Sequence, residues 1–324
     1  MAAKKSGRSN APAARNKARP GTPVLPVGPA RAEFVPPGRR LRDRLARGFL
    51  PLPGAFNAVT GMIAQQAGFE ALYVSGSGTA TGDFGLPDLG LTTLTEMAEA
   101  ARRIASATGL PVLADADMGF GGPVHVARTV REFEAAGVAG IHIEDQSFPK
   151  RCGHLDGKML IPPEAMAAKI EAAAAARRDD SFYLVARCDA KAVEGLDAMI
   201  ARCTLYARAG ADMIFAEALA DAAEFRRIAA ALAPLDVPVM ANMTEFGKSA
   251  LLTAADLEKA GVAAVIWPLT AFRMMLQAAQ DAYRELARTG TQKELLPRMM
   301  TRQTMYDLIG YAAIEQRIRE GQTP

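Results

Sequence analysis

The amino-acid sequence predicts an α/β fold, a closed (β/α)₈ barrel of the TIM type with extra C-terminal helices. Eight short apolar runs follow one another from residue 50 onward, and longer Ala-rich stretches separate them. Nearly continuous apolar runs are typical of strands buried on both faces, as in a parallel sheet. Polar residues collect at the ends of these runs, where barrel enzymes keep their active sites. The even spacing favours the barrel over the alternative, a doubly wound open sheet.

The predicted strands are short, and a helical stretch separates each from the next. In chain order they are Leu52–Phe56, Ala71–Gly76, Pro111–Asp117, Gly140–Asp145, Phe182–Asp189, Met213–Ala218, Val237–Met243 and Ala263–Pro268. Four helical stretches end in Ala-Gly directly before a strand, in the segments QQAGFEALYV, EAAGVAGIHI, ARAGADMIFA and EKAGVAAVIW. Glycine just past a helix end allows the left-handed turn into the next strand. This repeated join indicates a repeated βα unit.

The N-terminal segment differs from the rest of the chain. Residues 1–40 hold nine Lys and Arg against Glu33 alone, and they are rich in Ala, Pro and Gly. This composition predicts a disordered basic tail, followed by a barrel domain at residues 41–324 that includes the C-terminal helices. Three interpretations of the tail stay open: loose binding to nucleic acid or acidic surfaces, an Arg-rich transit peptide, and an inert extension. The remainder is mildly acidic, which argues against a nucleic-acid-binding body.

The sequence shows neither a membrane span nor a signal peptide. No apolar run approaches the ~20 residues that a membrane span needs, and the N-terminus lacks the apolar core of a signal peptide. Cys152, Cys188 and Cys203 are too few and too scattered for a disulfide framework. We therefore expect a cytoplasmic protein with reduced thiols.

Carboxylates at the predicted strand ends suit a metal ion. Asp115, Asp117, Glu144 and Glu217 offer the hard oxygen ligands that Mg²⁺ or Mn²⁺ prefers. Asp115 and Asp117 are two apart on one predicted strand, so both side chains should point the same way. Zinc fits poorly, because the candidate soft ligands near the rim lack a paired CxxC or HxxxH spacing: Cys152, His154 and Cys188. Further polar residues end the same runs: Ser75, His142, Asp145, Arg187, Asp189, Asn242, Thr244 and Glu245.

Two loops add further chemistry. Cys152 lies in the loop KRCGH (Lys150–His154), whose cationic side chains favour a reactive thiolate over the alternative, an inert buried cysteine. Cys188 and Cys203 are assigned structural roles. The segment SGSGTATG follows the second strand with GxGxxxG spacing, which does not match a dinucleotide-binding loop. We expect it to cradle a small anion through backbone N–H groups, with Arg187 and Arg273 as fixed cations for carboxylates.

Several segments together carry a family resemblance. The loop KRCGH resembles the signature loop of the isocitrate lyase and phosphoenolpyruvate mutase superfamily. Further segments are similar to those of the methylisocitrate lyases in unbroken order over about residues 48–320: YVSGSG, GLPDLG, DADMGFGG, HIEDQ, NMTEFG, PLTAFR and GTQKELLPRMMTR. The resemblance implies a Mg²⁺-dependent retro-Claisen cleavage of 2-methylisocitrate to pyruvate and succinate. It also implies a homotetramer whose subunits exchange C-terminal helices.

The resemblance assigns roles to individual residues. Asp115 and Asp117 match the metal-site acids, and Glu144 and His142 are assigned to the catalytic residues. Tyr73 would help to take the hydroxyl proton, and Cys152 would give a proton to the succinate fragment. Ser75, Gly76 and Ser77 match the cradle for the keto acid. The implied substrate contacts are Gly153, His154, Arg187, Glu217, Asn242, Thr244, Arg273 and Arg302.

The substrate itself is less tightly specified. A 2,3-dimethylmalate lyase and a carboxyphosphoenolpyruvate phosphonomutase are alternatives on the same scaffold, although a mutase needs no thiol to protonate a succinate enolate. Ser77, Cys188 and Ala216 stand where the family usually has Gly, Thr and Pro, and we expect all three near the substrate. Phe215, Ile266 and Trp267 are expected to line the space for the substrate methyl group. An idle protein that binds nucleic acid through its tail is the non-enzymatic alternative, and the complete metal and thiol set argues against it.

Overall fold

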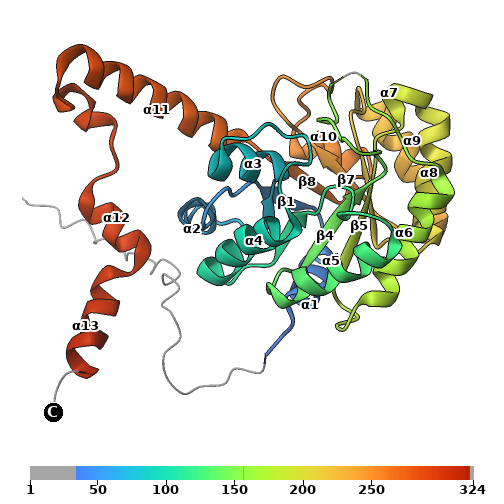
Figure 1. Cartoon of the computed structure of the whole chain (residues 1–324), viewed down its shortest axis with the longest axis horizontal. Coiled ribbons are helices and arrows are strands. Elements are labelled where there is room, and N and C mark those ends of the chain that lie inside the picture. Colours follow the sequence, from blue (N-terminus) through green and yellow to red (C-terminus); the bar gives the residue numbers. More distant parts are fainter. Residues whose placement is uncertain (1–33, 156, 322–324) are drawn as a thin grey trace, which may run out of the picture.

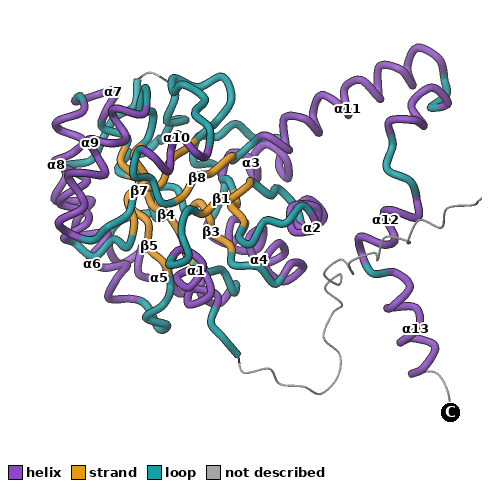
Figure 2. The backbone as a smooth tube through the Cα atoms, turned by 180° about the vertical axis from the view of Figure 1, so that it is seen from behind, coloured by secondary structure: helices purple, strands orange, loops and turns teal. Residues whose placement is uncertain are grey.

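The computed structural model describes residues 34–155 and 157–321, and it confirms the barrel. Eight parallel strands lie in the order β1-β8-β7-β6-β5-β4-β3-β2 (Figures 1 and 2). A bridge between Gly54 and Tyr73 joins the two remaining edges, and the Ala55 N–H donates to the Tyr73 carbonyl at 2.9 Å. The strands are β1 (Leu50–Pro53), β2 (Leu72–Val74), β3 (Val112–Asp115), β4 (Gly140–Glu144), β5 (Tyr183–Cys188), β6 (Met213–Ala216), β7 (Val239–Asn242) and β8 (Ala264–Trp267).

Helices surround the sheet on its outer face (Figure 2). The glycines of the four predicted joins all take positive φ, from 77° at Gly137 to 107° at Gly210, so each ends its helix as expected. The helices are α1 (Pro37–Leu45), α2 (Ala58–Gln66), α3 (Gly76–Phe84), α4 (Leu94–Thr108), α5 (Pro123–Ala135), α6 (Pro163–Ala176), α7 (Lys191–Glu194), α8 (Leu196–Arg208), α9 (Ala222–Leu232), η1 (Ala233–Leu235), α10 (Ala254–Lys259), α11 (Thr270–Thr289), η2 (Lys293–Arg298), α12 (Arg302–Ile309) and α13 (Tyr311–Gly321).

The strand side chains divide into two cores, because successive residues of a strand point to opposite faces. One core fills the barrel interior, where Leu52, Phe215 and Ile266 pack together. The larger core lies between the sheet and the helices. Trp267 packs against this outer core. The expectation that Trp267 lines the substrate space is therefore wrong, because it follows the inward-facing Ile266 on the same strand.

Helix α1 closes the base of the barrel. Leu41 is 2% exposed and packs in the interior core with Leu50 and Ala71. Gly38 lies so close to the Ser181 carbonyl that a Cβ there would approach its oxygen to 2.4 Å. The expected tail boundary at residue 40 therefore falls inside α1. The rest of that predicted tail, residues 1–33, lies outside the described part of the chain.

The third strand ends earlier than predicted. β3 stops at Asp115, and Asp117 has a φ of 46°, in the left-handed region. Asp115 and Asp117 therefore do not share a strand face. Their carboxylates still meet, because a Cβ on Gly76 would lie 2.7 Å from Asp115 Oδ2 and 3.4 Å from Asp117 Oδ1.

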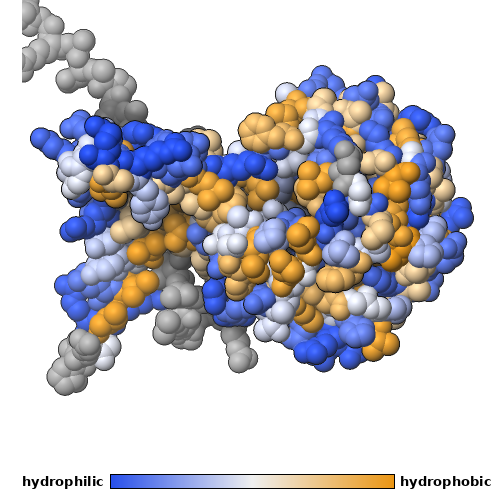
Figure 3. All heavy atoms as spheres, turned by 45° about the horizontal axis from the view of Figure 1, so that its top comes forward, coloured by the Kyte–Doolittle hydropathy of each residue, from blue (hydrophilic) through white to orange (hydrophobic). Residues whose placement is uncertain are grey.

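The C-terminal arm, residues 270–321, leaves the barrel along α11, and its helix α12 contacts α2, with Leu308 of α12 buried. Helix α11 runs outward, and α12 and α13 follow at its far end (Figure 1). Many apolar side chains of the arm are exposed, and they gather in patches along it (Figure 3). They include Met274, Tyr283, Leu296, Met300, Met305, Tyr311 and Ile318. Within residues 34–155 and 157–321, no helix is long and apolar enough to cross a membrane.

Candidate active site

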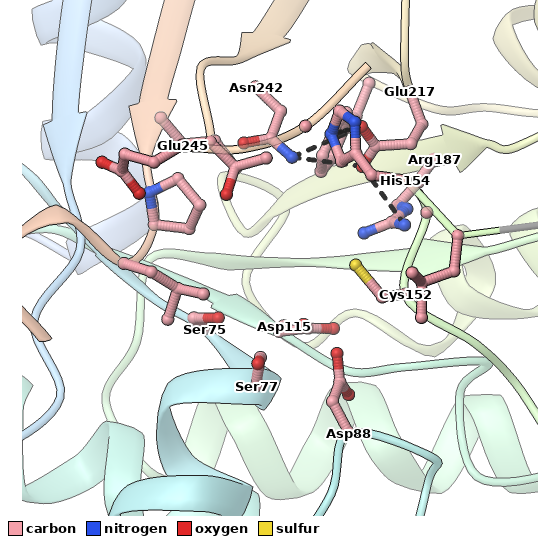
Figure 4. A pocket seen from close by; sticks show the side chains of 18 of the residues that line it. Ser75, Ser77, Asp88, Asp115, Cys152, His154, Arg187, Glu217, Asn242 and Glu245 are labelled. Carbon is pink, nitrogen blue, oxygen red and sulfur yellow. Dashed lines mark hydrogen bonds and ion pairs between the residues drawn. The ribbon is translucent and has the colours of Figure 1, made fainter. Parts of the chain in front are cut away.

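A cavity of about 240 Å³ lies at the carboxyl ends of the strands (Figure 4). It brings together most of the predicted site residues: Tyr73, Ser75, Ser77, Asp115, Cys152, Gly153, His154, Arg187, Glu217, Asn242, Thr244 and Arg273. Four more lie directly behind the cavity wall, and each contacts a residue that lines it: Gly76, Asp117, His142 and Glu144. The sequence therefore located the rim correctly.

Arg302 is the predicted site residue that the fold does not bring to this cavity. It begins α12 in the C-terminal arm, and its side chain is exposed. Two of the three family departures also lie away from the cavity. Cys188 and Ala216 pack in the core behind the strands, whereas Ser77 lines the cavity. The expectation that all three lie near the substrate is correct for Ser77 alone.

Asp115 is the better fixed of the two predicted metal ligands. Its Oδ2 accepts a hydrogen bond from the Gly76 N–H at 3.0 Å, and its Oδ1 accepts one from the Asp117 N–H at 2.9 Å. Burial alone would raise the pKa of Asp115, but the neighbouring His142, Lys150 and Arg187 lower it to about 2. Asp115 is therefore ionised at neutral pH.

Asp117 behaves differently from its neighbour. Burial raises the pKa of Asp117 to about 6, against the opposing effect of Lys150. The Lys150 ammonium contacts Asp117 Oδ1 and lies 2.5 Å from Asp88 Oδ1. Although burial would lower the pKa of Lys150, the carboxylates of Asp117, Glu144 and Asp115 raise it well above its usual value. A cation is thus held at the place where the sequence predicted a metal ion.

The residues at this corner fit a hard divalent cation. The second oxygen of Glu144, Oε1, is buried without a hydrogen-bond partner among the described residues. Burial raises the pKa of Glu144 well above its usual range. In the described part of the chain, no three His, Cys, Asp or Glu side chains form a ready-made metal cluster. Mg²⁺ commonly takes only one or two carboxylates and fills its other positions with water and substrate oxygens, so Asp115 and Asp117 suffice.

Lys150 and Asp88 were missed as members of this corner. Lys150 was interpreted as a neighbour of the thiol, and Asp88 lies in GLPDLG, after α3 rather than after a strand. Polarity at strand ends could not find either residue. One signal in the sequence could have found Lys150. It is a cation in a loop that follows a predicted strand, and the predicted strand ends carry several carboxylates that need a positive partner.

Tyr73 and His142 form a buried pair beside the metal corner. The Tyr73 hydroxyl lies 2.8 Å from His142 Nε2, and the same nitrogen lies 3.5 Å from Asp115 Oδ1. Burial lowers the pKa of His142 to about 4, although Asp115 raises it. Burial also raises the pKa of Tyr73 well above its usual value. At neutral pH the pair is therefore an uncharged phenol next to an uncharged imidazole.

Arg187 is the central cation of the site. Its guanidinium binds Asp189 through Nε at 2.9 Å and Nη2 at 3.1 Å. It also lies 3.3 Å from Glu144 Oε2 and 3.2 Å from Glu217 Oε2, and it stacks 5.0 Å over the Phe215 ring. Arg187 and Phe215 both line the cavity, so a fixed cation stands beside an apolar wall.

The thiol of Cys152 is not the thiolate that the sequence suggested. Burial raises the pKa of Cys152, against a hydrogen bond from the His154 backbone. The basic side chains of the loop lie against carboxylates instead, since Lys150 contacts Asp88 and Asp117, and His154 Nε2 lies 2.9 Å from Glu217 Oε1. Cys152 is therefore a neutral acid at pH 7. Its sulfur points into the cavity between Arg187 and Asp115 (Figure 4).

Comparisons with known proteins agree with this geometry. The family model of phosphoenolpyruvate phosphomutase matches residues 41–287. The 2-methylisocitrate lyase of Aeropyrum pernix is 47% identical over 285 residues, which cover 88% of this chain and 91% of that protein. The crystal structure of a 2,3-dimethylmalate lyase, a PEP mutase/isocitrate lyase superfamily member, has a TM-score of 0.83 at 34% identity and covers 89% of this chain and 96% of its own. A phosphonopyruvate hydrolase in complex with oxalate and Mg²⁺ has a TM-score of 0.77 at 29% identity, covering 88% of this chain and 98% of its own.

Proposed function

The chain belongs to the phosphoenolpyruvate phosphomutase family, and from this premise we propose that it is a metal-dependent carbon–carbon lyase that cleaves 2-methylisocitrate to pyruvate and succinate. The observation that carries the proposal is the neutral, cavity-facing thiol of Cys152 opposite the paired carboxylates of Asp115 and Asp117. Retro-Claisen cleavage needs a group that accepts the hydroxyl proton and an acid that protonates the departing carbanion. The two sides of this cavity offer one of each.

Asp115 and Asp117 would hold Mg²⁺ or Mn²⁺, and Glu144 lies behind them. When bound, the ion supplies Lewis acidity toward the oxygens of the keto-acid fragment. The related hydrolase that binds Mg²⁺ with oxalate supports this choice of metal. Ser75 and Ser77 lie at the N-terminal end of α3, where backbone N–H groups and the helix dipole favour a carboxylate.

Tyr73 and His142 can remove the substrate hydroxyl proton together. With His142 Nε2 as the acceptor, the Tyr73 hydroxyl donates its own proton and leaves its oxygen to receive the one from the substrate. Asp115, 3.5 Å from the same imidazole nitrogen, stabilises the positive charge that then forms on His142. The hydroxyl carbon becomes the ketone of pyruvate as its bond to the neighbouring carbon breaks.

Cys152 completes the reaction on the other fragment. The electron pair of the broken bond stays on the carbon next to a succinate carboxylate, and the thiol gives that carbon its proton. Arg187, which the surrounding carboxylates fix in place, is positioned to bind a carboxylate of this fragment. Asn242 donates to both oxygens of Glu217, at 3.3 and 3.2 Å, and so holds that wall of the site.

The proposed substrate of the site is a small polycarboxylate. Arg187 and Arg273 both line the cavity and offer cations for its carboxylates. A reducing cytoplasm is the compartment that we propose, because Cys152, Cys188 and Cys203 are all free thiols. Both proposals agree with the small-molecule chemistry named for the 2-methylisocitrate lyase relative.

The preference for a methyl-bearing keto acid rests on Phe215 and Ile266. Both line the cavity as expected, and together they offer apolar space near the Ser75–Ser77 cradle. A methyl group in such a pocket is worth roughly 10–200-fold in specificity. We expect kcat/KM for 2-methylisocitrate to exceed that for isocitrate by a factor in this range, measured as release of the keto acid with Mg²⁺ present. A higher value for isocitrate would contradict the proposed substrate.

2,3-Dimethylmalate is the second candidate substrate. The likeness to the solved 2,3-dimethylmalate lyase favours it, and Ser77 changes the polarity of the cradle at the cavity surface. The same assay with 2,3-dimethylmalate distinguishes the two lyases. If it gives the highest kcat/KM of the three substrates, the metal-assisted cleavage stands and the 2-methylisocitrate assignment falls.

A homotetramer that exchanges its C-terminal arms is the assembly that we propose. The exposed apolar side chains of the arm need a partner surface, and Arg302 can approach a substrate only in another copy, because it lies outside the cavity of its own chain. Light scattering on the full chain and on a chain that ends at residue 290 tests this. We expect the shortened chain to lose the tetramer, and a monomeric full chain would contradict the proposal.

A further inference from the structure

Lys158 is a buried cation that no step of the proposed reaction uses. Its side chain is 1% exposed, and its ammonium lies 3.2 Å from Asp189 Oδ1. The same ammonium donates to the backbone carbonyl of Gly153, the residue that follows the catalytic thiol. Neither Lys158 nor Asp189 lines the cavity. Any effect of this pair on the reaction must therefore pass through the residues that it holds.

Asp189 is bound on every side. Its two carboxylate oxygens accept two hydrogen bonds from Arg187, at 2.9 and 3.1 Å. Its own backbone N–H donates to Asp145 Oδ1 at 2.8 Å, and Asp145 Oδ2 accepts a hydrogen bond from the Tyr206 hydroxyl of α8 at 2.8 Å. The carboxylate is fully buried, so it is anchored to the barrel wall while it holds both cations.

Gly153 contacts both Lys158, through its carbonyl, and the guanidinium of Arg187. A Cβ on Gly153 would lie 2.3 Å from Arg187 Nη2 and 2.4 Å from Glu217 Cγ. The backbone next to the thiol is therefore packed directly on the guanidinium. One carboxylate, Asp189, fixes Arg187 directly and fixes Gly153 through Lys158.

We propose that Lys158 and Asp189 form a positioning brace that sets the Cys152 thiol against Arg187. The brace deepens the proposed function, because it places the proton donor and the carboxylate-binding cation at a fixed separation. Lys158 acts on the thiol side through the Gly153 carbonyl, and Asp189 acts on both sides. The two residues should therefore affect kcat and KM differently, which a purely structural role would not produce.

The test compares Lys158→Met and Asp189→Asn with wild type and with a matched control. Lys191→Met is the control, because Lys191 also joins a carbonyl, that of Ala218, to a carboxylate, that of Glu224, and it lies outside the cavity lining. Three quantities are measured for each protein: kcat and KM for 2-methylisocitrate, the melting temperature, and the rate at which iodoacetamide alkylates Cys152, followed by mass spectrometry. Cys188 and Cys203 are buried and serve as internal references.

We expect Lys158→Met to lower kcat by about tenfold to a hundredfold with little change in KM, because a charge-assisted hydrogen bond to the backbone beside the thiol is lost. Asp189→Asn should lower kcat and also raise KM at least ~10-fold, because Arg187 loses its bidentate partner. Both variants should change the alkylation rate of Cys152 by at least ~10-fold, whereas Lys191→Met should match wild type in all three quantities.

Two results would overturn the brace. One is wild-type alkylation of Cys152 in a folded Lys158→Met protein, and the other is an equal effect of Lys191→Met. If Asp189→Asn does not fold, Lys158→Met decides the matter alone. The alkylation rate needs no turnover, so a wild-type enzyme that fails to cleave 2-methylisocitrate would refute the proposed substrate and leave the brace to be judged on the thiol.

Discussion

At the base of the barrel, Leu41 of α1 lies in the interior hydrophobic core with Leu50 and Ala71. At the rim, β4 and β5 bury a carboxylate and a cation, Glu144 and Arg187. The base and the rim are separated by the length of strands that have only three to six residues. The rim also leaves buried atoms of its site, such as Glu144 Oε1 and His142 Nδ1, without a hydrogen-bond partner among the described residues.

This difference separates stability from function within one fold. Burying apolar area stabilises the folded state, whereas burying polar groups without partners costs free energy. At the rim, a bound metal ion or substrate can supply the partners that these buried atoms lack in the free protein. Substitutions at the rim should therefore reduce activity with little loss of stability, and substitutions at the base should do the reverse.

The largest expected effect is at Asp117. Asp117→Ala should abolish the response to Mg²⁺ and lower kcat by at least about a thousandfold, because a bound metal supplies several kcal/mol of charge stabilisation. The melting temperature should change little, because removing a buried carboxyl whose pKa burial raises offsets the lost contact with Lys150, which keeps Asp88 as a partner. Steady-state kinetics across a Mg²⁺ titration checks this. Asp83→Ala, at an exposed carboxylate of α3, is the control, and a retained Mg²⁺ response in Asp117→Ala would contradict the assigned site.

Cys152 gives the next largest effect. Cys152→Ala should leave the melting temperature within the error of wild type and lower kcat at least ~100-fold, as expected for loss of a positioned proton donor. Cys203→Ala is the matched control, because that thiol is buried in the outer core, away from the cavity. It should lose stability and keep its kcat. A Cys152→Ala enzyme with normal kcat would place the acid elsewhere in the cavity.

At the base, a substitution should reduce stability more than activity. Leu41→Ala should destabilise the protein by about 2–5 kcal/mol, because it leaves a void in a packed core, and it should keep kcat close to the wild-type value. Denaturant unfolding measures the free energy of unfolding. Phe34→Ala provides the control, since Phe34 is 81% exposed and close to Leu41 in the chain. Equal stabilities of the two variants would mean that α1 contributes little at the base.

The sequence predicted the fold correctly where a residue type strongly favours one environment or one backbone conformation. Continuous apolar runs located all eight strands, because buried strands need apolar side chains on both faces. Glycines at the helix ends were recognised because few other residues adopt a positive φ. Asp115, Glu144 and Glu217 were placed at the rim because parallel strands in a barrel end on the same side.

The errors share another cause, which is that they depend on contacts between distant segments. The pKa of Cys152 follows from its burial and from which carboxylates the basic side chains of the loop contact. The inward or outward direction of Trp267 follows from the register of β8 with β1 and β7. The place of Arg302 depends on the direction in which α11 leaves the barrel (Figure 1). A local pattern contains none of this information.

The smallest expected effect is a pH dependence that only the rim should show. Because burial raises the pKa of Asp117 to about 6, protons compete with a divalent ion for its carboxylate below that pH. The affinity for Mg²⁺ should therefore fall by about tenfold for each pH unit below about 6, and it should be nearly constant above about 7. Calorimetric titration of the full chain with Mg²⁺ between pH 5 and 8 measures this.

The stability of the metal-free protein should not follow the same curve. A carboxyl whose folded pKa is raised favours the folded state as pH falls from about 6 toward its ordinary value of 3.8, so Asp117 adds stability there. His142 acts in the opposite direction, because its folded pKa of about 4 lies below its ordinary value of 6.5, and the unfolded chain binds that proton more readily. The two effects offset each other between about pH 4 and 6. A melting temperature that falls in parallel with Mg²⁺ affinity would show that the whole barrel, and not the rim alone, responds to acid.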